Sequence, residues 1–285
     1  MKKLKISGEL MVFIGAVLWS LNSPLVKFIH IDSILVCGLR SVIASIAMCA
    51  FIRPKKLKWS PWMLIYVVAY AAVCLAVLVA LKMTSAPIAV GMQYTSVVWI
   101  FILNLLIKRR FKLKEFFPVC IIIAGVVLFM LSGTDATNKA GNLLALTSGF
   151  TFMLMTLGAK KAAGDNAIGL VAIANVFTAI AVFVMFPSCA AEIPTMTVTD
   201  WLIMAVLGVV QVGGGYTFYT LGSQRTAPQK ATVIALWELI LGPIWVALCG
   251  IEIPSIIVII GFAIIIAGML IYTKLNPEQD SEKNA

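Results

Sequence analysis

Charged side chains are scarce in this chain of 285 residues. Asp, Glu, Lys and Arg make up 12% of it, whereas hydrophobic residues make up 61%. About a quarter of a soluble chain is charged, so this composition excludes an ordinary soluble protein. The hydrophobic residues form continuous runs of about 20, the length that crosses a bilayer as an α-helix. The alternating segments of about ten residues that indicate a membrane β-barrel are absent from the sequence.

Histidine and paired cysteines are also scarce. The single histidine is His30, and the six cysteines show no CxxC spacing. We therefore expect no disulfide framework, no metal site and no cofactor. The sequence offers no nucleophile beside a base, so we do not expect an enzyme. No loop is long enough for a soluble domain, which disfavours a sensory or chaperone-like membrane protein. An enzyme that acts on lipid head groups is the alternative to a transport function. A channel is disfavoured because the sequence has no filter-like repeat.

The hydrophobic runs predict an all-α integral membrane protein with ten transmembrane helices. Their approximate bounds are 8–28, 33–52, 62–83, 88–107, 116–131, 141–159, 167–186, 201–221, 231–250 and 254–273. The loops between them are short. The polar segment 276–285 is expected to be a disordered cytoplasmic tail.

The loop charges predict the orientation of the helices in the membrane. Nearly all loop lysines and arginines fall on one side, at positions 2, 3, 5, 53, 55, 56, 58, 108, 109, 110, 112, 114, 160, 161, 225, 230, 274 and 283. Basic loops stay in the cytoplasm, so both termini should face it, in a cell (inner or plasma) membrane. The net charge of +10 thus reflects topology and contact with anionic lipid, and no nucleic-acid partner is expected.

Three short motifs recur in the same order in the two halves of the chain. IIIAG occurs at 121–125 and 264–268, SAP at 85–87 resembles TAP at 226–228, and Gly8 with Leu10 matches Gly141 with Leu143. The spacing is about 140 residues, which predicts a first repeat at 1–134 and a second at 135–275. Each repeat holds five helices, an odd number, so the second must be inverted relative to the first. Inverted repeats suit a transporter whose halves rock around a central site; whether the chain forms a homodimer is left open.

Glu238 is the acidic residue placed centrally in a predicted span. A carboxylate at membrane depth costs several kcal/mol, which favours a helix that faces a polar cavity. Glu238 is a candidate proton carrier or counter-ion for a cationic solute. The alternative is a fixed ion pair with Arg40, which also lies well inside its helix; Arg40 itself is a candidate for a solute carboxylate.

Other polar and aromatic residues at membrane depth complete the predicted solute site. Trp19 and Asn22 are three residues apart on one helix face, which suits a pocket wall. Gln93, Gln211 and Tyr216 are the further candidates. For all of them, ordinary helix–helix packing is the competing interpretation.

Candidate hinges lie in the eighth and ninth predicted helices. Three consecutive glycines, Gly213, Gly214 and Gly215, weaken a helix and allow bending. Pro243 frees a carbonyl one turn earlier. Lys27 and Lys82 lie near helix ends, where reaching toward the membrane surface is the ordinary explanation and a gate role for Lys82 the alternative.

These features resemble the ten-helix EamA family of the drug/metabolite transporter superfamily. The motifs that carry the resemblance are WSLNSPLVK at 19–27, Arg40, YTLG at 219–222, TAP at 226–228, GPIW at 242–245, GIE at 250–252, and Gly261 with Gly268. The fourth helix departs from this pattern, because VWI at 98–100 replaces the proline and KRR at 108–110 replaces the acid. We therefore expect the ninth helix to be broken into two half-helices, and we do not extend this expectation to the fourth.

The resemblance implies a secondary transporter that works without ATP. We expect it to move a small polar metabolite, an amino acid or related solute, by alternating access. Export is the expected direction, and proton exchange is one candidate driving force. The alternative is an efflux pump for amines or lipophilic cations with Glu238 as the counter-ion. Solute and lipid bilayer are the expected partners.

Overall fold

A computed structural model describes residues 6–52, 59–108, 111, 113–132, 136–162, 166–226 and 228–275. The predicted tail at 276–285 lies outside the described residues, as do most of the basic residues of the predicted cytoplasmic loops.

The helices follow one another along the chain with short connections. They are α1 (Gly8–Ser20), α2 (Asn22–Phe28), α3 (Ser33–Ile52), α4 (Pro61–Met83), α5 (Ala86–Gly91), η1 (Met92–Thr95), α6 (Ser96–Lys108), α7 (Leu113–Ser132), α8 (Ala136–Ala162), α9 (Ala167–Met185), η2 (Pro187–Thr195), α10 (Val198–Ala205), η3 (Val206–Gly214), α11 (Gly215–Ser223), α12 (Pro228–Ala235), α13 (Trp237–Leu248) and α14 (Ile256–Leu275). Of these, η1 and η2 are 3₁₀-helices and η3 is a π-helix.

Ten spans are long and hydrophobic enough to cross a membrane, which confirms the predicted fold class. Each predicted span overlaps one of them almost end to end. Four spans are built from consecutive segments: α1 with α2, α5 with η1 and α6, α10 with η3 and α11, and α12 with α13. The connection between α9 and α10, for which no helix was predicted, contains the 3₁₀-helix η2.

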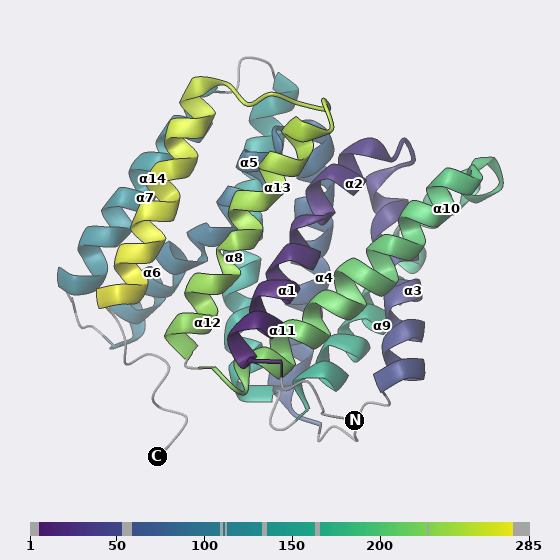
Figure 1. Cartoon of the computed structure of the whole chain (residues 1–285), viewed down its shortest axis with the longest axis horizontal. Coiled ribbons are helices and arrows are strands. Elements are labelled where there is room, and N and C mark those ends of the chain that lie inside the picture. The colour runs from purple at the N-terminus through teal and green to yellow at the C-terminus, as the bar shows by residue number, and fades with distance from the viewer. Residues whose placement is uncertain are drawn as a thin grey trace.

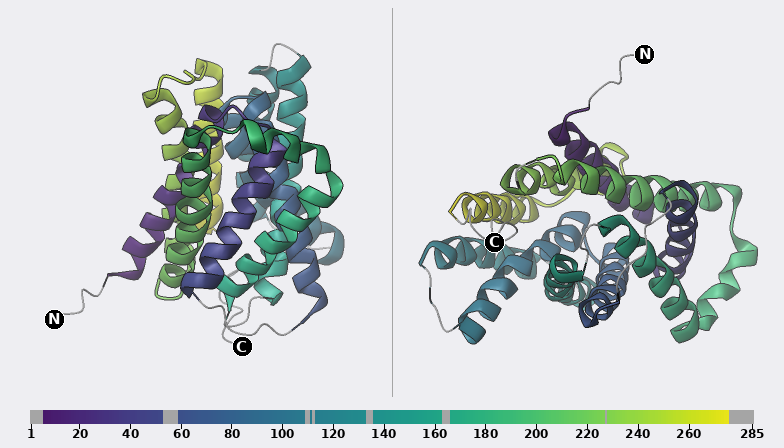
Figure 2. Two further views of the ribbon diagram at one scale, coloured as in Figure 1. Left: turned by 90° about the vertical axis from the view of Figure 1, so that its right-hand side faces the viewer. Right: turned by 90° about the horizontal axis from the view of Figure 1, so that it is seen from below.

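The spans form two layers that face each other (Figure 1, Figure 2). One layer holds α1, α11, α12 with α13, and α14, and the other holds α4, α8, α6 and α7. Packing of α7 against α14 closes one edge, and packing of α3 against α9 closes the other. The start of α1 and the end of α14 lie at the same end of the bundle (Figure 1). We call the opposite end the far end.

The repeated motifs of the two halves pack against each other reciprocally. A Cβ added to Gly125 would lie 2.7 Å from Ile265 Cγ1, and a Cβ added to Gly268 would lie 2.7 Å from Ile122 Cγ1. All four residues belong to the two IIIAG motifs. An isoleucine of each motif thus packs against the glycine of the other motif, as expected if an approximate two-fold axis relates the two halves.

The same exchange holds for whole helices. In the second half α8 packs on α4 of the first, and in the first half α1 packs on α11 of the second. The contact of α3 with η3 is likewise mirrored by that of α9 with α4. The halves therefore interlock, and their interface is the centre of the molecule.

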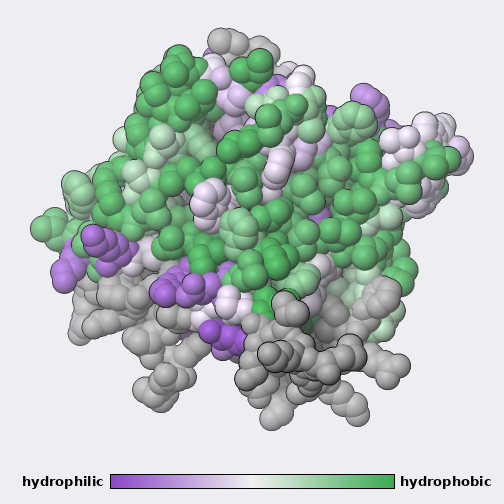
Figure 3. Space-filling model, in the orientation of Figure 1, coloured by the Kyte–Doolittle hydropathy of each residue, from purple (hydrophilic) through white to green (hydrophobic). Residues whose placement is uncertain are grey.

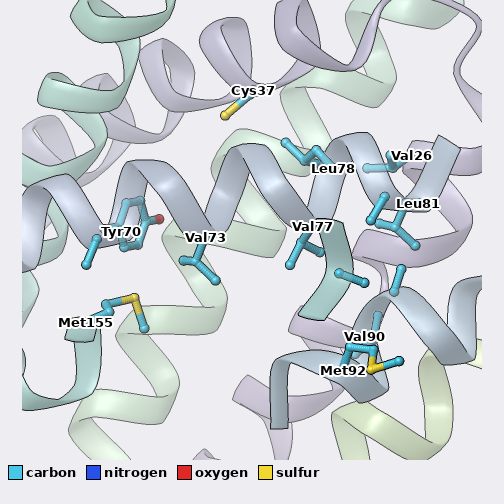
Figure 4. Packing of buried hydrophobic residues seen from close by; sticks show 14 of the residues in the cluster. Val26, Cys37, Tyr70, Val73, Val77, Leu78, Leu81, Val90, Met92 and Met155 are labelled. Atoms are coloured by element: carbon cyan, nitrogen blue, oxygen red, sulfur yellow. The ribbon is translucent and has the colours of Figure 1, made fainter. Parts of the chain in front are cut away.

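Hydrophobic side chains fill the centre and also cover the outside. Around α4, residues such as Tyr70, Val77 and Leu81 pack against Cys37 of α3 and Met92 of η1 (Figure 4). The outer face is hydrophobic over most of its area, and hydrophilic side chains gather near the end where α1 begins (Figure 3). Such an outside suits contact with lipid tails, as the composition predicts.

Two interruptions in spanning helices have a visible local cause. In the first span the helix turns at Leu21, because Pro24 lacks the N–H that would bond a carbonyl one turn earlier. In the eighth span the π-helix η3 ends at Gly214, within the predicted glycine hinge. A Cβ on Gly215 would lie 2.5 Å from Trp19 Cδ1, so the glycine lets the indole reach the helix backbone.

Candidate functional site

Two broken helices meet at the centre of the bundle, one from each half. The fourth span is interrupted by η1 (Met92–Thr95), and the ninth turns at Leu236 between α12 and α13. These are corresponding positions of the two repeats. The fourth span is thus interrupted without a central proline, and Pro243 of the ninth lies inside α13 rather than at the turn.

Glu238 lies in the first turn of α13, directly after the break. Tyr94 of η1 donates a hydrogen bond from its hydroxyl to Glu238 Oε2 over 3.3 Å. Both side chains are half-buried. Broken helices leave backbone groups free to bind a solute, and transporters place them at the binding site. The carboxylate and the phenol therefore mark the point where the two halves meet.

An aromatic wall lies beside this pair. The Trp19 ring centroid is 4.9 Å from that of Tyr216 and 4.7 Å from that of Tyr219. Tyr70 of α4 lies 5.9 Å from Tyr216, which links the two layers. Tyr216 is also within electrostatic range of Glu238. The wall can stack on a flat or hydrophobic part of a solute held at the carboxylate.

Arg40 of α3 reaches the same region from the edge of the bundle. Its Nη1 donates a hydrogen bond to Asn22 Oδ1 over 2.9 Å, at the start of α2. Asn175 of α9 donates its amide to the Tyr70 hydroxyl over 3.1 Å. Among the described residues no ion pair joins Arg40 to Glu238: the carboxylate contacts Tyr94 and the guanidinium contacts Asn22.

The two glutamines of the predicted site have different surroundings. Gln211 is buried on η3, and in the described part of the chain its Oε1 accepts no hydrogen bond. Gln93 is half-buried in η1, directly before Tyr94. Within the described residues no hydrogen bond ties its amide to the other predicted site residues. The structure therefore gathers Trp19, Asn22, Tyr216 and Glu238 around one centre, with Gln211 and Gln93 on neighbouring helical segments.

At the far end two lysines fasten the first span to the rest of the bundle. Lys27 Nζ lies 2.5 Å from Glu252 Oε2 and donates to the Thr84 carbonyl over 2.9 Å. Lys82 donates a hydrogen bond to the Ile29 carbonyl. We call these contacts the far-end latch. Both lysines therefore bind protein groups in the described structure, in addition to lying near helix ends.

A cavity of about 490 Å³ with a mixed polar and apolar lining opens at the far end, between the end of α2 and the start of α10. The carboxylates in its wall already have partners: Glu192 accepts the Asp32 N–H, and Asp200 completes a capping box with Thr197. The cavity is therefore a water-accessible recess beside the latch, and its acids stabilise local backbone.

The sequence model of the EamA-like transporter family matches residues 6–131 and 139–274, which span both repeats. The chain belongs to the EamA-like transporter family. A search of curated proteins found no match. Twenty-one chains of solved structures are similar. One of them, a crystal structure of a protein 17% identical in sequence, aligns over 93% of this chain and 98% of that chain with a TM-score of 0.62. At that identity the likeness shows the fold alone.

Several residues at the centre of this EamA-family protein were not among the predicted site residues. They are Tyr70, Tyr94, Tyr219 and Asn175. The sequence carried a signal for Tyr219, which begins the YTLG motif of the eighth span. Tyr70 lies in a run of hydrophobic residues in α4, and only packing across the layers reveals its place.

Proposed function

We propose that this EamA-family protein is a secondary transporter that exports a small polar metabolite, an amino acid or related solute, by alternating access. The observation that carries the proposal is the contact of Glu238 with Tyr94, because it joins broken helices at corresponding positions of two inverted repeats. A site between two such halves can be exposed to either side when the halves rock.

The basic loops support an orientation with both termini in the cytoplasm of a cell membrane. In that orientation the far end faces outward. The far-end latch then closes the outer side, since Lys27 ties α2 to Glu252 and to the end of α4. Release of solute to the outside requires this latch to open. The chain then acts by binding and moving an unchanged solute, and an enzyme acting on lipid head groups is the weaker alternative.

A second candidate is an efflux pump for amines or lipophilic cations. The aromatic wall favours it, because tyrosine and tryptophan rings attract cations. Glu238 would then be the counter-ion of the cation. The buried charge of Arg40 weighs against this candidate, since it repels a cation held at the same centre.

Transport by the purified full chain tests both candidates. Proteoliposomes are loaded with amino acids, amines, cationic dyes or nucleosides, and counterflow of the labelled, unchanged solute is measured. Counterflow of amino acids supports metabolite export, and counterflow of cationic dyes alone supports the cation pump. Chemical change of supplied lipid without movement of any solute contradicts both and supports an enzyme.

A further inference from the structure

Arg40 is a buried cation without a carboxylate partner. The residue is only 4% exposed, and its Nε is buried without a hydrogen-bond acceptor in the described structure. Its Nη1 donates to Asn22, a neutral amide. Among the residues that the structure describes, the ion pairs involve other groups.

The groups that surround Arg40 do not supply a negative charge either. Its electrostatic neighbours are the thiols of Cys37 and Cys74 and the phenols of Tyr70 and Tyr216. Thiols and phenols are poor counter-ions compared with a carboxylate. A charge buried without a partner is strongly unfavourable, so these surroundings are incomplete without an anionic group.

The unpaired charge of Arg40 lies at the proposed solute site. Tyr216 interacts electrostatically with both Arg40 and Glu238, and its ring contacts Trp19. A buried positive group and a half-buried negative group therefore both lie within electrostatic range of Tyr216, and they do not pair with each other. A solute with both a negative and a positive group can pair with Arg40 and Glu238 at the same time.

We propose that Arg40, positioned by Asn22, binds the carboxylate of the transported solute, while Glu238 faces its ammonium group. This inference rests on the proposed function and narrows its substrates to zwitterions with one carboxylate. A guanidinium binds a carboxylate through parallel N–H bonds, and here Nε is free for one of them. A doubly charged phosphate is disfavoured because Glu238 repels the second negative charge.

The test compares matched solutes on the full chain. Each amino acid is added to purified protein beside its amide and beside the amine that lacks the carboxylate, and the melting temperature is recorded. A ligand that binds only the folded state raises it. We expect at least one free amino acid to stabilise the protein, with its amide and amine about tenfold weaker or more. Equal stabilisation by the amide overturns the inference, and so does the absence of stabilisation by every amino acid.

Variants separate binding from folding. We expect Arg40→Gln to lose the stabilisation by amino acids and Arg40→Lys to keep a part of it. Arg225→Gln, at an exposed position after the C-cap of α11, should behave as wild type. Arg40→Met should melt no lower than wild type without solute, because it removes an unpaired buried charge. A large drop in its melting temperature shows a structural role and contradicts the inference.

Proteoliposome counterflow distinguishes failure of the inference from failure of the proposed function. If amines or neutral solutes cross the membrane and amino acids do not, the proposed transport function is supported and the proposed carboxylate site at Arg40 is refuted. If no solute crosses with wild-type protein, the proposed function itself fails.

Discussion

Replacing Gly215 by alanine should damage the aromatic wall, whereas the same change at Gly214 should not. A Cβ at position 215 would lie 2.5 Å from Trp19 Cδ1 and 2.7 Å from its Nε1. Favourable contacts between such atoms need about 3.5–4.0 Å, so the indole must move by about 1 Å. At Gly214 the nearest atom is Leu18 Cδ1 at 3.2 Å, the end of a flexible side chain.

The indole cannot move freely, because it lies against two other rings. Its centroid is 4.9 Å from Tyr216 and 4.7 Å from Tyr219, and each such contact contributes about 0.5–1.5 kcal/mol. Overpacking lowers the free energy of unfolding by about 1–3 kcal/mol. Alanine in place of glycine inside a helix raises it by about 0.5–1 kcal/mol, and this gain applies to both variants. We therefore expect Gly215→Ala to be less stable than Gly214→Ala by about 2 kcal/mol, since only the first meets the ring.

The assay is thermal unfolding of both purified variants beside wild type, followed by counterflow in proteoliposomes. A difference of about 2 kcal/mol corresponds to roughly 4–8 °C in melting temperature. Transport should fall with Gly215→Ala and persist with Gly214→Ala. If the two variants melt and transport alike, the packing of Trp19 on the eighth span does not shape the site.

The other predictions concern the contacts between the two halves. Lys27→Gln and Glu252→Gln should each lower the melting temperature by weakening the far-end latch. The double variant should show a coupling energy of about 1–2 kcal/mol between the two changes in thermal unfolding. Strictly additive effects of the two changes would refute the latch. Gly125→Ala should destabilise the packing of α7 on α14 by about 1–3 kcal/mol, because its Cβ would lie 2.7 Å from the Gly261 carbonyl oxygen, a backbone atom that cannot turn away. Unfolding temperatures equal to that of Gly213→Ala, where the nearest atom is at 3.3 Å, would contradict this.

The ten spans and the repeat could be predicted because their signals are local. Length and hydrophobicity define a spanning helix one segment at a time. The recurrence of IIIAG required only comparison of the halves, and the structure shows the two motifs packed on each other. For the same reason Glu238 stood out, since a carboxylate in a hydrophobic run is rare.

The details of the site depend on contacts between distant residues, which no local signal reports. Nothing in the sequence of the fourth span predicts η1, because no proline lies between Met92 and Thr95. The ninth span turns at Leu236, although Pro243 was the expected hinge. Lys27 and Glu252 are 225 positions apart in the numbering, so their pairing appears only when the spans are assembled.

Counterflow of an amino acid by Glu238→Gln tests the central claim most directly. The matched control is Trp237→Phe, one residue earlier on the exposed face of α13, where the ring packs on Phe13. We predict that wild type and Trp237→Phe exchange the solute, and that Glu238→Gln folds but loses exchange. Exchange by Glu238→Gln at the wild-type rate would show that the carboxylate at the broken helices takes no part in transport.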